Sequence, residues 1–365
     1  MMVSELKKAV ALLKRAAADG KTRPILGGIL INATGMESTD LDVAFSATME
    51  TGIEEPIVVD AKRLSQVIRP LKAKDEVTLE RGESTLIVRH AGGSVKLPML
   101  AEADEFPRTD TVDESSMGFK GLMFPSYALQ AALKRVCVAS AKDSTRYQLH
   151  SVLFVMKDGT LSMIATDGKR LVRETLPAGG DDFEAIVPLP AVELMVRMPF
   201  IASLQFDDAN VRATSANGYG RTSSSEGFTV EARTVEGIFP DWKRAFPDEC
   251  WNRFGMNIVE LLGAVETAKI ATTKETNSVA FEVKDGVMTV SAESTLNGEA
   301  SATLPAACAT GATIKANFNP DYVVDLCKSL KGEDTITLAM KDHKNAGLFI
   351  VDDFSCVIMP LVTHD

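Results

Sequence analysis

Residues 4–15 read SELKKAVALLKR, a stretch in which apolar residues recur at helical spacing. These apolar positions are Leu6, Ala9, Val10 and Leu13. Ser4 stands at the start of the stretch, where a capping side chain is expected. Residues 61–74 repeat the spacing with Leu64, Val67, Ile68 and Leu71. We therefore predict two amphipathic helices in the first third of the chain, the first of them capped by Ser4.

Short alternating runs follow the second helix at residues 76–79, 85–88 and 94–98, with glycines between them. Alternation of apolar and polar residues predicts β-strands, and the glycines predict turns. The last third has the same order, with helical stripes from Ile258 and Val323 and then runs at 335–338, 347–350 and 355–360. The middle third has a predicted helix over 126–142, a weaker one over 190–197, and runs at 203–206 and 210–213.

The repeated order indicates an internal repeat. Corresponding helical stripes begin at Leu6, Leu129 and Ile258. Such even spacing favours three copies of one α+β domain, although any α+β chain alternates helices and strands. We predict domains at residues 1–115, 116–247 and 248–365, with linkers near 109–117 and 247–255.

The composition is that of an ordinary globular protein. The chain has 365 residues, 45% of them hydrophobic and 24% charged, which suits two or three domains. No stretch approaches the roughly 20 apolar residues of a membrane helix, and the N-terminus lacks the pattern of a secretory signal. Five singly placed cysteines favour reduced thiols over disulfides or zinc. We expect a cytoplasmic protein that does not bind membranes.

The charges are unevenly distributed. Lys and Arg number 39 against 50 Asp and Glu, so the net charge of −11 should repel nucleic acid. The predicted helices over 4–15, 61–74 and 126–142 nevertheless carry +3, +5 and +3, while the other three are neutral. The helices then sum to +11 and the rest of the chain to −22. This pattern favours a basic helical lining that contacts phosphates without reading bases. The alternative is that each basic helix face is simply solvated.

Motifs for catalysis are missing. The sequence has no phosphate-binding glycine loop, no nucleophile elbow and no zinc-protease motif. Two acidic pairs, Asp40 with Asp42 and Asp181 with Asp182, could in principle hold magnesium but lack further ligands. We expect no catalytic residues, no metal and no cofactor.

Several segments resemble one family, the bacterial sliding clamps, which are the β subunit of DNA polymerase III. Residues 21–30 (KTRPILGGIL) and 38–41 (STDL) are similar to its first domain. Residues 143–149 (DSTRYQL), 165–171 (ATDGKRL) and 237–242 (GIFPDW) are similar to its second, and 318–322 (FNPDY) and 357–361 (VIMPL) to its third. The resemblance implies three clamp domains per chain, each with two helices packed on antiparallel sheets. It also implies that two chains join head to tail into a closed ring.

The same resemblance implies a non-enzymatic processivity factor that encircles duplex DNA and slides without sequence preference. Weak phosphate contacts suit sliding, because tight binding would stall the ring. The implied partners are duplex DNA, a second copy of the chain, the replicative DNA polymerase, the clamp loader and repair factors. The protein partners would bind through short peptides with Leu and Phe anchors.

The family's functional positions can be carried over residue by residue. The partner-peptide pocket between the second and third domains matches Leu149, Thr166, Gly168, Lys169, Arg170, Leu171, Pro240, Arg244, Ala245, Val357, Met359, Pro360 and Leu361. The expected DNA-facing residues are Arg23, Arg69, Lys134, Arg135, Arg146, Tyr147, Gln148, Asn319 and Tyr322. At the subunit contact, Phe106 of one chain should meet Ile270 of the other, because such contacts need an apolar centre.

Some positions depart from the family pattern. Lys169 stands where the family commonly has His, Ala245 is smaller than the usual aliphatic residue, and residues 362–365 continue past the point where many relatives stop. The neutral helices of the last third predict weaker DNA contact there. Two other interpretations remain: a repeat-built scaffold without a DNA role, and a phosphodiester-processing enzyme that uses the acidic pairs.

Overall fold

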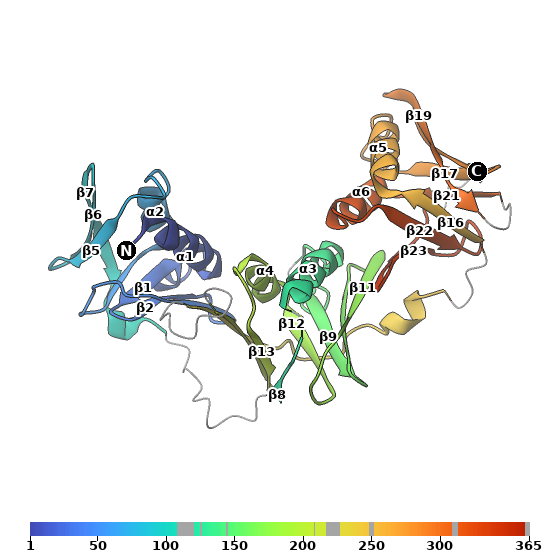
Figure 1. Cartoon of the computed structure of the whole chain (residues 1–365). Coiled ribbons are helices and arrows are strands. Elements are labelled where there is room, and N and C mark those ends of the chain that lie inside the picture. Colours follow the sequence, from blue (N-terminus) through green and yellow to red (C-terminus); the bar gives the residue numbers. More distant parts are fainter. Residues whose placement is uncertain are drawn as a thin grey trace. The chain divides into compact units, whose positions relative to one another are not determined.

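The computed structural model describes residues 1–107, 120–124, 126–143, 145–207, 209–216, 227–247, 252–308 and 313–361 (Figure 1). They form α-helices and antiparallel sheets, which confirms the predicted α+β class. The chain divides into two compact units. The first comprises Met1–Gln130, Ala178–Asp181 and Val187–Val235, and the second comprises Ala131–Pro177, Asp182–Ile186 and Glu236–Asp365.

Helices α1 (Val3–Ala16) and α2 (Ala61–Ile68) of the first unit pack against each other. The prediction that Ser4 caps the first helix is wrong, because the helix begins at Val3 with Met2 in the capping position. The backbone N–H groups of Val3 and Ser4 donate to the carbonyls of Asp75 and Ala73 at 2.9 and 3.0 Å. These free donors of the first turn are therefore satisfied by neighbouring backbone instead of a serine hydroxyl.

Two helices end earlier than the sequence analysis predicts. Helix α2 stops at Ile68 because Pro70 lacks the N–H that would continue it, so Arg69 lies past its end. Helix α3 (Ser126–Val136) continues only as a short 3-10 turn over Cys137–Ala139. With these bounds the six described α-helices carry +5 instead of +11, and the remaining residues carry −16. The charge segregation is real but weaker than predicted.

The first unit has one eleven-stranded sheet, in the order β5-β6-β7-β4-β1-β2-β3-β15-β14-β13-β8. Its strands are β1 (Gly28–Asn32), β2 (Gly35–Thr39), β3 (Val43–Thr48), β4 (Ile57–Asp60), β5 (Val77–Arg81), β6 (Thr85–His90), β7 (Gly93–Ala101), β8 (Lys120–Gly121), β13 (Ser203–Phe206), β14 (Asn210–Ala216) and β15 (Gly227–Arg233). Helix α1 packs on β2 and β3, and α4 (Leu189–Arg197) packs on β15.

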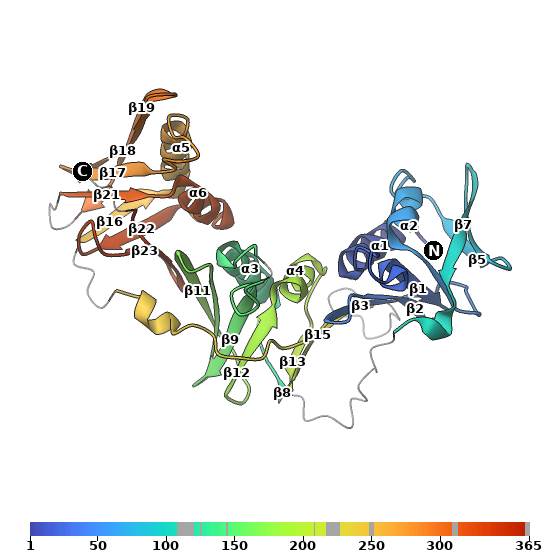
Figure 2. The same ribbon diagram turned by 180° about the vertical axis from the view of Figure 1, so that it is seen from behind.

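The second unit has a nine-stranded sheet, β12-β9-β10-β11-β24-β23-β22-β16-β20, and a four-stranded sheet, β19-β18-β17-β21. The strands of the larger sheet are β9 (Ser151–Lys157), β10 (Thr160–Thr166), β11 (Arg170–Pro177), β12 (Phe183–Pro188), β16 (Asn252–Asn257), β20 (Ala307–Cys308), β22 (Thr335–Met340), β23 (Gly347–Val351) and β24 (Phe354–Ile358). Those of the smaller sheet are β17 (Val279–Lys284), β18 (Val287–Ser294), β19 (Gly298–Pro305) and β21 (Ile314–Phe318). Helices α5 (Ile258–Lys269) and α6 (Pro320–Ser329) pack side by side, as Figures 1 and 2 both show.

The strand order repeats three times. Four-stranded blocks occur as β4-β1-β2-β3, β12-β9-β10-β11 and β21-β17-β18-β19. Three-stranded blocks occur as β15-β14-β13, β24-β23-β22 and β7-β6-β5. The last strand of a four-stranded block pairs with a three-stranded block at β3–β15 and again at β11–β24. Domain boundaries at 115 and 247 stay a prediction. The linker near 109–117 lies entirely outside the described residues, as does part of the one near 247–255.

Three further observations bear on the function class. In the part of the chain that the structure describes, no helix is both long enough and apolar enough to cross a membrane. No group of three or more metal-ligating side chains gathers among those same residues. Cys327 and Cys356 are reduced, and burial raises the pKa of both thiols to about 12, so they are unreactive at neutral pH.

Candidate functional site

A tight turn joins β10 to β11 and carries the centre of the expected peptide pocket. The Thr166 hydroxyl donates to the carbonyl of Arg170 at 2.7 Å. The Asp167 carboxylate accepts from the backbone N–H groups of Lys169 and Arg170 at 2.9 and 3.0 Å. Gly168 adopts a φ of 87°, a conformation that suits glycine because it has no Cβ. The turn is therefore fixed before any partner arrives.

The C-terminal residues lie against this turn. Strand β24 pairs with β11 so that Val357 faces Leu171, and the Met359 N–H donates to the Lys169 carbonyl at 3.0 Å. The Leu361 N–H donates to the Asn317 carbonyl at 2.8 Å. Their backbone is held, yet the side chains of Met359 and Leu361 are 49% and 39% exposed. Leu171 and Val357 are buried beneath them, at 3% and 1% exposed. We call Leu171, Val357, Met359 and Leu361 the partner-peptide surface.

Arg170 points away from this surface. Neighbouring residues of a strand project to opposite faces of the sheet, so Arg170 and Leu171 diverge. The Arg170 guanidinium is 5% exposed, with Nη1 3.1 Å from Oδ2 of Asp325 and Nε 3.2 Å from Oδ2 of Asp167. Its central carbon lies 4.5 Å from the ring centroid of Tyr322 on α6. Arg170, expected in the peptide pocket, and Tyr322, expected to face DNA, are thus in contact with each other within the second unit.

Other members of the expected pocket lie around the same turn and the segment before β16. Leu149 is half-buried, and its carbonyl accepts from the Ala141 N–H at 2.9 Å. Pro240 and Arg244 are exposed, Ala245 and Pro360 are half-buried, and Lys169 is exposed. All residues of the predicted pocket belong to the second unit.

Sequence reasoning missed a cation–aromatic contact that holds part of this region. Arg173 shares the face of β11 with Leu171, and its guanidinium lies 5.9 Å from the Trp242 ring and 5.6 Å from the Phe246 ring. Trp242 begins the 3-10 helix η4 (Trp242–Ala245), which carries Arg244 and Ala245. The available signal was the position of Arg173, two residues after Leu171 and so on the same face.

Four of the expected DNA-facing cations are exposed and make no ion pair among the described residues. They are Arg23, Arg69, Lys134 and Arg146. Tyr147, next to Arg146, is 69% exposed, and Gln148 is half-buried. These side chains are available for contacts to phosphate and sugar.

Arg135 and Asn319 are engaged within the chain instead. Arg135 donates to both oxygens of Glu174, with Nε at 2.9 Å from Oε2, and to Oε1 of Glu333 at 3.1 Å. Burial raises the pKa of the Glu174 carboxyl above its ordinary value, and the Arg135 hydrogen bond opposes this. Asn319 caps α6 by accepting from the Asp321 N–H at 2.9 Å. Both residues organise local structure, which the resemblance alone did not reveal.

The two residues expected at the subunit contact differ in exposure. Phe106 is 4% exposed and packs on Leu30 and Val58 within its own unit. Ile270 follows α5 and is 74% exposed. Val259, three helical turns earlier, and Leu296, between β18 and β19, are 72% and 81% exposed. Sequence reasoning missed these two, because neither belongs to a buried apolar stripe.

Known proteins match this architecture along the whole chain. The family model of the DNA polymerase III beta subunit N-terminal domain matches residues 2–110, and that of its C-terminal domain matches residues 243–361. The beta sliding clamp of Chlamydia muridarum is 25% identical over 376 residues, 99% of this chain and 98% of that protein. The beta sliding clamp of Pseudomonas aeruginosa is 25% identical over 374 residues, 98% of this chain and 97% of that protein.

Solved structures share the fold. The DNA polymerase III beta subunit of Thermotoga maritima superposes with a TM-score of 0.86 at 21% identity, covering 100% of this chain and 98% of that one. The Bacillus subtilis sliding clamp gives 0.83 at 19% identity, with coverages of 100% and 98%. Because the two family models together cover more than half of the chain, this protein belongs to the family of the DNA polymerase III beta subunit, the bacterial sliding clamps.

Proposed function

We propose that two copies of this chain form a closed ring that encircles duplex DNA, slides without sequence preference and tethers the replicative polymerase and other factors. Membership of the family makes the protein a non-catalytic processivity subunit of DNA polymerase III. The ring proposal rests on an open strand edge. Two of the three four-stranded blocks are continued by a three-stranded block, and the third ends, among the described residues, in an unpaired edge.

The unpaired edge is the outer edge of β19. Among the described residues, β19 pairs only with β18. Strand β7 pairs with β6 over residues 93–98 and with β4 only at Met99 and Ala101, so residues 93–98 keep one edge open. The other two four-stranded blocks are each continued by a three-stranded block. Pairing of β19 in one chain with β7 in a second would supply the third such junction.

This contact is heterologous, because two different surfaces meet. Heterologous contacts give a ring when the rotation closes. Ile270, Val259 and Leu296 supply the apolar side chains beside β19, since α5 packs on that strand. Phe106 is packed within its own chain, so we assign the apolar centre to these three residues and leave Phe106 out.

Contact with DNA is assigned to Arg23, Arg69, Lys134 and Arg146, with Tyr147 beside the last of them. A few exposed cations in a chain of net charge −11 give weak, salt-sensitive binding. Weak binding is what sliding requires, because the closed ring and not affinity holds the DNA. Arg135, Asn319 and Tyr322 support these DNA contacts indirectly, because they fix α3 and α6.

Short peptides of partner proteins bind the partner-peptide surface, with Leu or Phe side chains on Leu171, Met359 and Leu361. The fixed backbone and the exposed side chains of Met359 and Leu361 support this, since a prepared apolar surface lowers the cost of binding. A clamp of Pseudomonas aeruginosa, 22% identical, has been solved bound to griselimycin, which supports ligand binding by this fold. The polymerase, the clamp loader and repair factors would share the surface.

Primer extension on a primed single-stranded circle tests the proposal. A bacterial polymerase III and its clamp loader should give long products only when the wild-type chain is present. Met359→Ala with Pro360→Ala should shorten the products, because the partner-peptide surface is damaged. Product lengths that do not respond to the chain would favour a scaffold without a DNA role.

A further inference from the structure

Arg173 carries a positive charge that no carboxylate neutralises in the part of the chain that the structure describes. It lies on β11 two residues after Leu171, and so on the same face of the sheet as the partner-peptide surface. Its Nε atom is buried and has no hydrogen-bond partner. Unlike Arg135 and Arg170, it forms no ion pair with any described residue. Buried donors of folded proteins are nearly always paired, so this exception needs a physical reason.

The surroundings of Arg173 hold the side chain without neutralising it. Across the sheet its neighbours are Ile164, which is fully buried, and Ser355. The centre of the guanidinium lies 5.9 Å from the Trp242 ring centroid and 5.6 Å from that of Phe246. Aromatic rings attract a cation, but they lack the oxygen acceptors that its N–H groups require. The guanidinium is therefore oriented and partly stripped of water, while its charge stays unmatched.

Part of the guanidinium remains open to a ligand. The side chain as a whole is half-buried, and among its nitrogens only Nε is both buried and unsatisfied. The Nη groups have no acceptor among the described residues and so face solvent. A carboxylate that reaches them forms charge-assisted hydrogen bonds. Because Arg173 has already lost part of its hydration, such a bond costs less desolvation here than at Arg244, whose side chain is 87% exposed.

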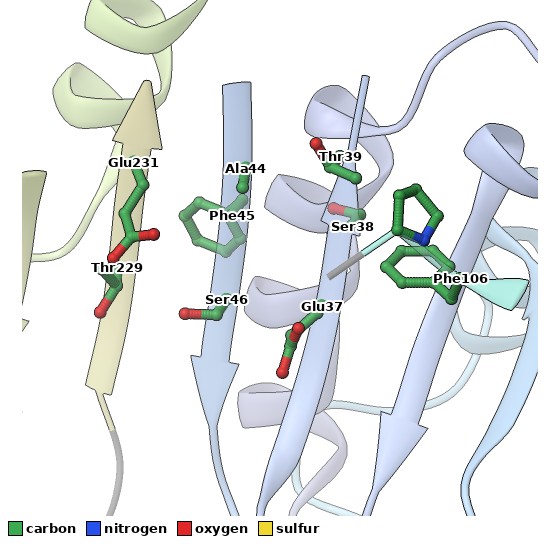
Figure 3. A pocket seen from close by; sticks show the side chains of 10 residues that line it. Glu37, Ser38, Thr39, Ala44, Phe45, Ser46, Phe106, Thr229 and Glu231 are labelled. Carbon is green, nitrogen blue, oxygen red and sulfur yellow. The ribbon is translucent and has the colours of Figure 1, made fainter. Parts of the chain in front are cut away.

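The first repeat shows that the strand pairing does not require an arginine at this position. The turn from Thr39 to Val43 has the same side-chain hydrogen bonds as the turn from Thr166 to Arg170. Counted from these turns, Ser46 of β3 faces Thr229 of β15 where Arg173 faces Ser355. Figure 3 shows Ser46 and Thr229 on these neighbouring strands, where both line a small hollow. A serine is enough for the same pairing, so the arginine of the second unit has a different role.

We propose that Arg173 is a carboxylate-binding position beside the partner-peptide surface, which selects peptides with an acidic group close to their Leu or Phe anchor. Arg173 and Leu171 are two residues apart on β11, a distance of about 6.6 Å along the strand. An extended peptide covers the same distance in two residues, so the carboxylate belongs about two residues from the anchor. It comes from an Asp or Glu side chain or from the C-terminal end of the peptide. The inference rests on the proposed function of the partner-peptide surface and adds a charge preference to it.

The charge of the whole chain makes such a preference easy to recognise. A net charge of −11 repels acidic peptides in general. Tighter binding of an acidic peptide than of its neutral twin must therefore come from a local cation. A peptide without a carboxylate near its anchor does not use this contact.

Calorimetric titration of the full-length protein tests the proposal. The probes are the acetylated and amidated peptides Ala-Leu-Phe-Gly-Asp-Gly and Asp-Gly-Leu-Phe-Ala-Gly, each with a twin that carries Asn in place of Asp. A third pair is acetylated Ala-Leu-Phe-Gly with a free or an amidated C-terminus. In at least one pair the carboxylate should strengthen binding about tenfold, which is the size of one charge-assisted hydrogen bond. The pair that responds identifies the source of the carboxylate, and equal affinities within all three pairs would overturn the proposal.

Substitution of Arg173 shows whether this side chain is responsible. In Arg173→Gln the two members of the responding pair should bind equally, whereas Arg173→Lys should keep part of the difference because it keeps the charge. Any loosening of η4 weakens both members alike and cancels in their ratio. Lys243→Gln is the matched control, since it removes an exposed cation 5.6 Å from the same Trp242 ring, and it should change the ratio by less than about twofold. A ratio that survives Arg173→Gln, or that falls as far in Lys243→Gln, would contradict the assignment.

The same titrations keep this inference separate from the proposed function. If no Leu/Phe peptide binds at all, the partner-peptide surface is wrong and the role of Arg173 falls with it. If the peptides bind but a carboxylate gains nothing, only the role of Arg173 is wrong.

Discussion

At the scale of single residues, Arg170 shows what a family resemblance can and cannot give. The resemblance assigned the residue to the partner-peptide pocket, and the structure places it at the end of the turn that begins at Thr166. It could not show that the guanidinium is buried against Asp325 and Tyr322, because Asp325 is 155 positions away in sequence. Arg135 is a similar case, since Glu333 lies 198 positions away. The sequence shows where a charged residue stands, but only the folded chain determines which residue it forms an ion pair with.

Arg170→Ala should lower the free energy of unfolding by about 2 kcal/mol, because two charge-assisted hydrogen bonds are lost. Urea denaturation measures the change. Arg244→Ala is the matched control, since the Arg244 side chain is 87% exposed and its ion pair with Asp241 is worth little. Equal losses in the two variants would contradict the structural role of Arg170.

Glu174 should make stability depend on pH in a particular direction. Burial raises the pKa of its carboxyl in the folded chain above the usual 4.5, so the folded state holds the proton to higher pH than the unfolded state. This contribution is fully present below pH 4.5 and is lost as the pH rises through the folded-state pKa. Arg135, Glu333 and Asp353 are the charged groups that face the carboxyl.

Glu174→Gln removes the titrating group and with it this part of the pH dependence. The difference in unfolding free energy between variant and wild type should therefore shift in favour of the variant as the pH rises from 4 to 7. Urea titrations at several pH values measure it. Parallel pH profiles for the two proteins would rule out the raised pKa.

At the scale of elements, periodicity predicted helices well and strands only in part. The runs at 85–88, 203–206, 335–338 and 347–350 all lie in strands. Strand β1 was missed because it is buried on both faces: Leu30 packs under Phe106, while Ile29 and Ile31 face the other way. Such a strand reads as a continuous apolar run without alternation. One of the two helices predicted too long contained Pro70, whose missing N–H should have ended it.

The contact of Arg173 with Trp242 belongs to this scale, because it fixes η4 on β11. Arg173→Ala should weaken a Leu/Phe peptide about two- to fivefold, since cation–aromatic contacts contribute roughly 0.5–1 kcal/mol. Calorimetric titration measures the affinity, and hydrogen exchange of residues 242–247 should quicken in parallel. Arg173→Lys should restore part of both. Weaker binding without faster exchange would mean that Arg173 contacts the peptide directly.

At the scale of the whole molecule, the account depends on how chains join. The sequence predicted a repeat and the resemblance implied a ring, but neither identified the edges that meet. From the repeated strand order we propose that these edges are β19 and β7, with Ile270 and Leu296 beside the former.

Leu296→Glu with Ile270→Glu should turn the dimer into a monomer, because charges in the apolar centre of the contact lose their hydration. Light scattering at micromolar concentration measures the mass. Ile238→Glu is the control, since Ile238 is 91% exposed in another part of the second unit. A dimer that survives the double substitution would move the interface elsewhere.

The central claim is that the ring holds DNA by enclosing it, and retention on circular DNA tests this most directly. The chain, placed on a nicked circular duplex by a bacterial clamp loader, should co-elute with the circle in gel filtration. A single restriction cut should then release it, because a ring slides off a free end. Retention that persists after the cut, or failure to stay on the uncut circle, would contradict the account.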